Sequence, residues 1–181
     1  SQEVRSNKLY LQSLICDWTG LQQDQNLIAT LGTSTEAIEP FRILPLEDAP
    51  ERHRARAEIF AKKSYGYITP LPSAPRLSQK PQRLRIGYFS ADFNEHPVSY
   101  LIVKALEMHD RRSFEVYAYS ISTARDDDMR QRIIKAADVF IDVCDMTDKG
   151  VALLARQDKI DIAIDLTGYT KNNRLGIFAY R

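Results

Sequence analysis

The chain of 181 residues contains little cysteine and little glycine. Its two cysteines, Cys16 and Cys144, do not have a metal-type spacing, and they favour reduced thiols in a cytoplasmic protein. No apolar run approaches the length of a bilayer-spanning helix, and no signal-peptide pattern begins the chain. Because the first residue is Ser1 rather than methionine, we expect the sequence to be a piece of a longer one.

An excess of either charge is also lacking. Twenty-five lysines and arginines stand against 24 aspartates and glutamates, which gives no reason to expect nucleic acid or an anionic membrane as a partner. Two phosphate-binding fingerprints are missing as well. The turn Gly87–Asp92 holds one glycine, so the dinucleotide pattern G-x-G-x-x-G is absent, and no P-loop run occurs. These absences exclude a nicotinamide or flavin dehydrogenase and a P-loop ATPase.

Three regions follow one another along the chain. Residues 1–68 have helical character, with apolar positions spaced for one helix face at 8–15, a further helix at 21–31 and good helix formers at Glu51–Tyr65. Residues 69–83 contain four prolines and read as a linker. Residues 84–181 alternate between apolar runs and amphipathic runs.

The alternation in the third region predicts an α/β fold. The strands are expected at Leu84–Ser90, Phe114–Ile121, Val139–Val143 and Ile160–Leu166, and the helices at Val98–Met108, Asp128–Ala137 and Asp148–Gln157. This order is typical of a parallel sheet with right-handed crossovers. The strand runs are continuously apolar, as expected when helices cover both faces of the sheet.

One histidine stands in a position suited to chemistry. His96 lies in the loop between the first strand and its helix, where open α/β sheets bind ligands, and its imidazole can exchange a proton near neutral pH. Pro97 restricts His96 to extended geometry and suits the first helical turn. From the residues alone, a catalytic role and a structural role for His96 are about equally favoured.

Other polar residues favour structural roles. His53 lies in a charged helix and is expected to be exposed to solvent, while His109 ends a helix and is expected to interact with its C-terminus. The triplet Asp126–Asp128 resembles a metal or sugar-nucleotide carboxylate cluster, but capping of the following helix explains it better. No metal site is predicted.

A second polar loop, Asp165–Arg174, follows the fourth strand and would therefore lie at the same sheet edge as His96. Gly168 permits a tight turn, and Thr170, Lys171 and Asn172 offer donors to a polar ligand. A solvated loop is the alternative, but two polar loops at one edge favour a site.

These residues resemble glycosyltransferase family 41, which comprises O-GlcNAc transferase and its bacterial relatives with tetratricopeptide repeats. The resemblance covers nearly the whole chain and rests on an ordered set of motifs: Cys16–Thr19, Arg85–Pro97, Phe114–Ser120, Asp165–Lys171, Asn173–Leu175 and Phe178–Arg181. It implies a Rossmann-like parallel sheet that forms the N-terminal lobe of a GT-B glycosyltransferase, and a preceding helical segment that links it to a repeat array.

The resemblance also implies a reaction and its residues. The donor would be a uridine-diphosphate sugar, with N-acetylglucosamine expected, and the acceptor a serine or threonine hydroxyl of a protein, with no metal or other cofactor. His96 would be catalytic. The residues expected to bind sugar or acceptor are Asn94, Pro97, Gly168, Tyr169, Thr170 and Lys171. Many bacterial relatives carry histidine where this chain has Tyr169, so a second imidazole is not expected here.

Two alternatives stay open at this stage. A relative of the same class could glucosylate asparagine, and a protein of another class could be a non-catalytic interaction module. Relatives continue beyond the position of Arg181 into a second lobe, which supplies most of the uridine and phosphate contacts. We therefore expect the 181-residue chain to be inactive by itself.

Overall fold

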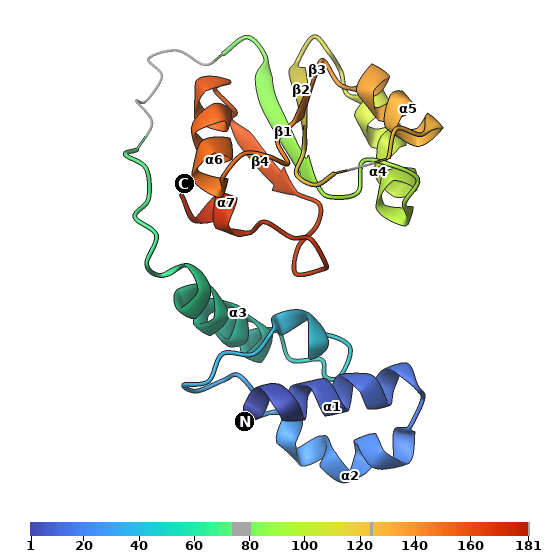
Figure 1. Cartoon of the computed structure of the whole chain (residues 1–181), viewed down its shortest axis with the longest axis vertical. Coiled ribbons are helices and arrows are strands. Elements are labelled where there is room, and N and C mark those ends of the chain that lie inside the picture. The colour runs from blue at the N-terminus through green and yellow to red at the C-terminus, as the bar shows by residue number, and fades with distance from the viewer. Residues whose placement is uncertain (74–80, 124, 181) are drawn as a thin grey trace. The chain divides into compact units, whose positions relative to one another are not determined.

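The computed structural model describes residues 1–73, 81–123 and 125–180 (Figure 1). The chain divides into two compact units, Ser1–Thr69 (unit 1) and Pro70–Arg181 (unit 2). Residues 74–80 of the predicted linker lie outside the described residues. The start of that linker packs within unit 2. The Leu71 N–H donates to the Tyr180 carbonyl at 2.9 Å, and Arg156 donates to the Pro72 carbonyl.

Unit 1 is helical, as predicted, although two helices begin earlier than expected. Its elements are α1 (Gln2–Leu14), α2 (Trp18–Ile28), a 3₁₀ turn η1 (Pro40–Arg42) and α3 (Pro50–Tyr65). The helix α2 begins three residues before its predicted start because Asp17 caps it, accepting the Gly20 N–H at 3.0 Å. A small apolar core is formed by Leu9 of α1, Ile28 of α2, and Leu31, Ile38 and Ile43 of the segments that follow α2.

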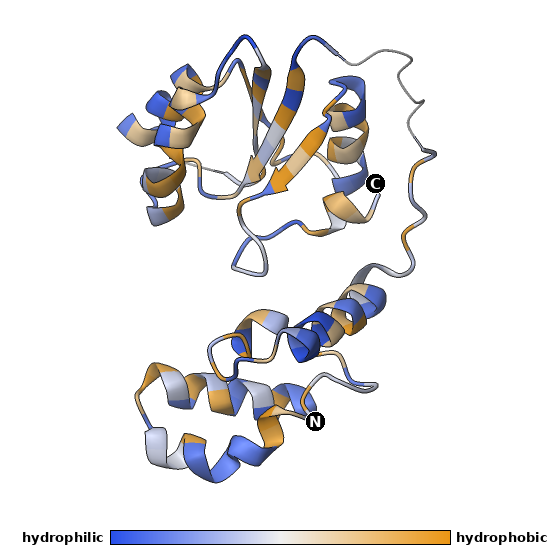
Figure 2. Cartoon of the chain, turned by 180° about the vertical axis from the view of Figure 1, so that it is seen from behind, coloured by the Kyte–Doolittle hydropathy of each residue, from blue (hydrophilic) through white to orange (hydrophobic). Residues whose placement is uncertain are grey.

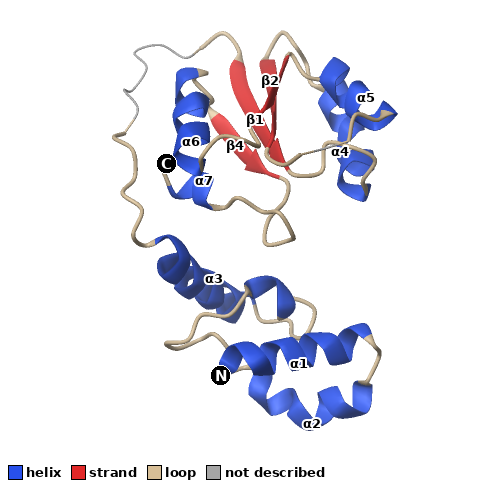
Figure 3. Ribbon diagram, viewed as in Figure 1, coloured by secondary structure: helices blue, strands red, loops and turns tan. Residues whose placement is uncertain are grey.

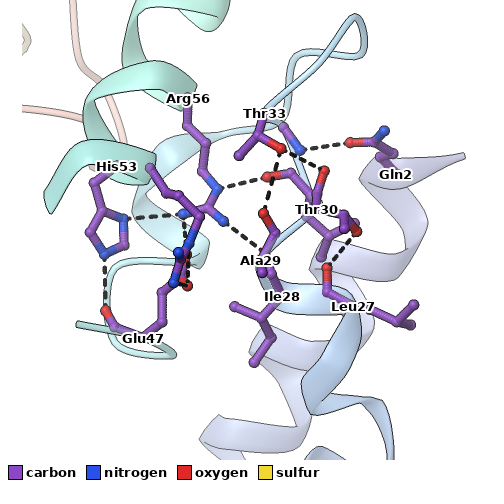
Figure 4. Close-up of polar contacts among 12 residues, drawn as sticks. Gln2, Leu27, Ile28, Ala29, Thr30, Thr33, Glu47, His53 and Arg56 are labelled. Carbon is purple, nitrogen blue, oxygen red and sulfur yellow. Dashed lines mark hydrogen bonds and ion pairs between the residues drawn. The ribbon is translucent and has the colours of Figure 1, made fainter. Parts of the chain in front are cut away.

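A buried arginine completes the interior of unit 1 (Figure 4). Arg56 of α3 has no exposed surface. Its guanidinium donates to the carbonyl of Ile28 at the end of α2 and to the carbonyl of Leu31 in the loop that follows, at 2.7 Å each. Its charge is balanced by Glu47, whose Oε1 lies 2.5 Å from Arg56 Nη1 as an ion pair rather than an aligned hydrogen bond.

The predicted exposure of His53 is wrong. The ring is half-buried, with Nε2 2.9 Å from the Glu47 carbonyl and Nδ1 3.5 Å from Arg56 Nη1. Charged neighbours in the sequence suggested an exposed face, but position 53 lies one helical turn before Arg56 and shares its buried side.

Stability of unit 1 is expected to fall in acid through Glu47. Burial raises the pKa of Glu47, but the hydrogen-bonded guanidinium of Arg52 and the paired guanidinium of Arg56 outweigh burial and hold the pKa below its ordinary value of 4.5. A lowered folded-state pKa contributes stability that is complete above about pH 4.5 and is lost as the pH falls through the folded-state value. Urea unfolding followed by the fluorescence of Trp18, the single tryptophan, measures this loss. Glu47→Gln should flatten the dependence, and an unchanged slope in that variant would contradict the assignment.

Unit 2 is built on a four-stranded parallel sheet, as predicted (Figure 3). Its strands are β1 (Leu84–Ser90), β2 (Phe114–Ser120), β3 (Val139–Asp142) and β4 (Ile162–Asp165). The inner strands β1 and β2 are buried from their third residue onward, whereas no residue of the outer strands β3 and β4 is fully buried. The strand β4 forms one edge of the sheet, and the hydropathy colouring of Figure 2 shows it as an apolar strand.

Helices cover both faces of this sheet (Figure 1). They are α4 (Pro97–Met108), α5 (Asp128–Ala136), α6 (Asp148–Gln157) and the unpredicted α7 (Gly176–Ala179). On one face Ile86, Tyr88, Val116 and Ala118 pack against α4 and α5. On the other face Phe89, Tyr117 and Tyr119 pack against α6 and α7. Among the described residues, no helix is both long and apolar enough to cross a bilayer.

Local capping signals set where these helices begin. Pro97 takes the first position of α4, Asp127 caps α5 by accepting the Arg130 N–H, and Thr147 caps α6 by accepting the Gly150 N–H. The capping role predicted for the triplet Asp126–Asp128 is therefore confirmed at Asp127. His109 also behaves as predicted, with Nδ1 2.5 Å from the Ala105 carbonyl near the end of α4.

Candidate functional site

The order of the strands creates a place for a ligand. The sheet runs β3-β2-β1-β4, so the chain leaves β1 towards one side and returns to its other side through α6. Ligands of open α/β sheets bind outside the carboxyl ends of the strands where the order reverses, which here lies between β1 and β4. The β1–α4 loop carries His96, and the loop after β4 carries Gly168. The structure thus brings both predicted loops to one edge.

The imidazole of His96 caps the helix that follows it. Nδ1 accepts the Val98 N–H at 3.3 Å, and the backbone of His96 is extended, with φ −142° and ψ 148°. Because Nδ1 accepts, this hydrogen bond assigns the proton of the neutral ring to Nε2. The side chain is 42% exposed, and the carboxylate of Asp92 lies 3.7 Å from Nδ1. At rest His96 therefore offers a hydrogen-bond donor, Nε2–H, to a ligand.

The residues beside His96 shape its loop. The Asn94 N–H donates to the Asp92 carbonyl at 2.8 Å, which closes a tight turn. Pro97 is exposed at the first turn of α4, and Asn94 is half-buried. The loop is anchored below by Ser99, whose hydroxyl donates to the Asp92 carbonyl at 2.5 Å. Asn94 and Pro97 thus flank the imidazole, and their contact with a ligand stays a prediction.

A carboxylate builds the second loop. Asp165 at the end of β4 accepts the Thr167 and Gly168 N–H groups at 3.0 Å each. Burial raises the pKa of Asp165, and these two hydrogen bonds oppose the rise. Gly168 has φ +59°, the left-handed conformation that glycine adopts freely, and the space where a Cβ would project is open. A ligand can therefore approach the backbone at Gly168 closely.

The three residues after Gly168 differ in what they can offer. Tyr169 is half-buried, and burial together with the charge of Asp165 raises the pKa of its phenol, so the hydroxyl stays protonated at neutral pH. The Thr170 hydroxyl donates to the Thr167 carbonyl at 2.6 Å, so towards a ligand it offers lone pairs rather than the donor that the sequence suggested. Lys171 is exposed and keeps its donor capacity.

One hydrogen bond joins the two loops directly. The buried hydroxyl oxygen of Thr167 accepts the Ala91 N–H at 3.1 Å. We expect Thr167→Val to leave this buried N–H without a partner and to lower the free energy of unfolding of unit 2 by about 1–3 kcal/mol. Thr167→Ser, which keeps the oxygen, should cost less. Amide hydrogen exchange of β1 and β2, which lie in unit 2, measures both. Equal costs for the two variants would contradict this role.

Sequence reasoning missed the residues that hold the loops in place. Asp165 and Thr167 build the second loop, and an aspartate two residues before Thr-Gly could have been recognised as a turn in which the carboxylate binds its own backbone. Arg174 anchors the far end of the same loop, donating to Asp148 and to the carbonyls of Val143 and Met146. Nothing local in the sequence indicated those contacts, because they cross between separate loops.

Among residues 1–73, 81–123 and 125–180, no group of three or more histidine, cysteine or carboxylate side chains is arranged to hold a metal ion. The polar atoms at the β1/β4 edge are hydrogen-bond donors and acceptors with two carboxylates, Asp165, which is engaged by backbone N–H groups, and Asp92, which lies beside the imidazole of His96. Such a set suits a polar organic ligand better than a bare cation.

The fold and this edge define a class of protein: a Rossmann-like α/β lobe that presents a histidine and a glycine turn where open sheets bind ligands. A family model for glycosyl transferase family 41 matches residues 52–181. The chain therefore belongs to glycosyltransferase family 41, as the sequence motifs implied.

Two curated relatives illustrate the match. The chain is 46% identical over 98 residues to the probable UDP-N-acetylglucosamine–peptide N-acetylglucosaminyltransferase SEC of Arabidopsis thaliana, covering 54% of this chain and 10% of that protein. It is 42% identical over 144 residues to the UDP-N-acetylglucosamine–peptide N-acetylglucosaminyltransferase of Caenorhabditis elegans, covering 73% of this chain and 12% of that protein. The chain thus spans about a tenth of the length of these relatives.

A solved structure confirms the fold class. The K341M mutant of the O-GlcNAc transferase from Thermobaculum terrenum matches 99% of this chain and 32% of its own, with a TM-score of 0.66 and 31% sequence identity. The predicted α/β class, a Rossmann-like N-terminal lobe of a GT-B glycosyltransferase preceded by a helical segment, is therefore correct.

Proposed function

We propose that the complete polypeptide transfers N-acetylglucosamine from its uridine-diphosphate donor to serine or threonine hydroxyls of proteins. The observation that carries this proposal is the β1/β4 edge, where a chain of glycosyltransferase family 41 presents His96 beside the open turn at Gly168. The curated relatives named above are peptide N-acetylglucosaminyltransferases, which supports the choice of sugar and of acceptor class.

The reaction joins an acceptor oxygen to the anomeric carbon of the sugar and breaks the bond from that carbon to the uridine diphosphate. The barrier falls through positioning of the two reactants and through stabilisation of charge on the leaving diphosphate. The second lobe, which this chain does not contain, supplies the diphosphate contacts in this proposal. The lobe formed by residues 84–181 contributes the surface on which the sugar and the acceptor bind.

His96 serves in this proposal as an orienting donor. Because Nδ1 is occupied by the Val98 N–H, the Nε2–H is the atom that can reach acceptor or sugar. Acting as a base through Nε2 would require the proton to shift to Nδ1, which would break the helix cap. The geometry therefore favours orientation of the substrates over removal of the acceptor proton.

The turn at Gly168 binds the sugar in this proposal. Gly168 leaves room for the ring to approach, Tyr169 offers a phenol, Thr170 offers lone pairs and Lys171 a charged donor. In this proposal no metal or other cofactor takes part. The free thiols of Cys16 and Cys144 support a reducing compartment, and we assign the protein to the cytoplasm on that ground.

The test uses the complete polypeptide and two labelled donors. Uridine diphosphate should bind with micromolar affinity by calorimetry, and label from UDP-N-acetylglucosamine should appear on serine or threonine peptides. Label from UDP-glucose on asparagine would instead establish the N-glucosyltransferase alternative. Absence of uridine-diphosphate binding would favour the non-catalytic module. The 181-residue chain alone should transfer no sugar, and measurable transfer by it would contradict the assignment of the diphosphate contacts to a second lobe.

A further inference from the structure

The first turn of α5 contacts the loop that carries His96. Asp127 uses one carboxylate oxygen, Oδ1, to cap α5 by accepting the Arg130 N–H at 2.9 Å. Its other oxygen, Oδ2, accepts the Glu95 N–H at 2.8 Å. Glu95 is the residue directly before His96. One side chain therefore fixes the start of a helix and the backbone next to the imidazole.

Arg130 adds a second contact from the same turn. Its guanidinium is buried, and Nη1 donates to the Phe93 carbonyl at 3.4 Å. Nη2 donates to both carboxylate oxygens of Asp142, at 2.6 and 2.7 Å, and the group lies 4.7 Å from the centre of the Phe140 ring. The sheet thus fixes Arg130 through β3. The backbone is held on both sides of Asn94, at Phe93 and at Glu95.

A helix cap alone does not require this arrangement. A serine hydroxyl would cap α5 as well as a carboxylate does, but only the longer carboxylate offers a second, separate oxygen to the Glu95 N–H. The neighbouring Asp126 is exposed and bonds to Gln131 within the same segment. Hydrogen bonds from Glu95 and Arg130 lower the pKa of Asp127 below its ordinary value of 3.8, so both oxygens are acceptors at neutral pH.

We propose that Asp127 is a positioning residue for His96, and that Asp127 and Arg130 together form a clamp on the loop from Phe93 to His96. The clamp fixes the backbone on the N-terminal side of His96, while Pro97 and the Val98 N–H fix it on the C-terminal side. The Nε2–H is thereby held at one place over the β1/β4 edge. The catalytic part of this proposal rests on the proposed function, whereas the clamp itself does not.

The clamp is tested directly in the 181-residue chain by amide hydrogen exchange. Asp127→Ser keeps the cap of α5 and removes the bond to Glu95, and Asp126→Asn is the matched control that removes the same charge one residue away. Exchange at the Glu95 amide should accelerate at least about tenfold in Asp127→Ser, while the α5 amides and the Asp126→Asn variant stay unchanged. Equal protection of the Glu95 amide in wild type and Asp127→Ser would overturn the clamp.

The link to His96 is tested by kinetics of the complete polypeptide. Asp127→Ser should lower kcat by about 10- to 100-fold with little change in KM for the donor, because displaced groups lose reactive geometry rather than affinity. In a His96→Ala background the same substitution should have no further effect. An equal fall in both backgrounds would show a general structural role and overturn the proposal. If the wild type transfers no sugar, the proposed function and the catalytic part fail together, and the exchange experiment still decides the clamp.

Discussion

Replacement of His96 by alanine in the complete polypeptide should lower the turnover number by about 10²-fold, because the substrates lose the donor that orients them. The side chain is 42% exposed and packs little, so the fold should survive. Its one structural contribution is the cap of α4, in which Nδ1 accepts the Val98 N–H at 3.3 Å. Steady-state kinetics with UDP-N-acetylglucosamine and an acceptor peptide measure the effect, and binding of uridine diphosphate should be unchanged.

A second variant separates the cap from the chemistry. His96→Asn can cap α4 through its side-chain oxygen, because asparagine is a good capping residue, but its amide does not reach as far as Nε2. The asparagine variant should therefore recover thermal stability and leave the turnover number low. Near-normal turnover in either variant would remove His96 from the mechanism. Recovery of turnover by asparagine alone would reduce the role of His96 to that of a cap.

Replacement of Arg56 by alanine should destabilise unit 1 by about 3–5 kcal/mol. Arg56 is completely buried, and its loss removes the guanidinium that donates to the carbonyls of Ile28 and Leu31 and leaves Glu47 without its buried partner. A penalty of this size is comparable with the whole stability of a small helical unit. Unfolding in urea followed by the fluorescence of Trp18, which lies in unit 1, measures it.

Two further variants make this result specific. Arg54 lies two residues away on the same helix, and its exposed pair with Glu58 has the ordinary spacing of a surface salt bridge. Arg54→Ala should therefore change the unfolding midpoint far less than Arg56→Ala. Arg56→Lys keeps the charge but not the fork that reaches both carbonyls, and an intermediate loss is expected. Equal midpoints for Arg54→Ala and Arg56→Ala would contradict the role assigned to the buried group.

The sheet was predictable from the sequence because each inner strand is a compact apolar run. The strand Leu84–Ser90 and the helix Asp148–Gln157 have the predicted bounds. The edge strand β4 is shorter than predicted, at Ile162–Asp165, because apolar Ile160 and Leu166 pack beyond the ladder rather than within it. Periodicity finds apolar stretches, whereas the length of a strand depends on the partner it pairs with.

The candidate site was only partly predictable. His96 and Gly168 carry local signals, a following proline and a turn glycine. The contacts that hold them cross between distant segments: Asp127 to Glu95 and Thr167 to Ala91. No local pattern encodes such pairs, and the burial of His53 beside Arg56 was missed for the same reason. Which residues touch the ligand stays a prediction at every position.

The pairing of β1 with β4 also determines when, during folding, the β1/β4 edge forms. The Ala91–Thr167 bond joins residues 76 positions apart, whereas the β1–β2 contact of Arg85 with Glu115 spans 30. Pairs so distant along the chain form late in folding, after nearer pairs have made them less costly. During synthesis, a ribosome-bound chain that ends before β4 contains the β1–α4 loop with His96 but lacks the loop with Gly168. The β1/β4 edge is therefore absent from any chain that ends before β4, and the sugar site that we propose there cannot form until that strand has been made.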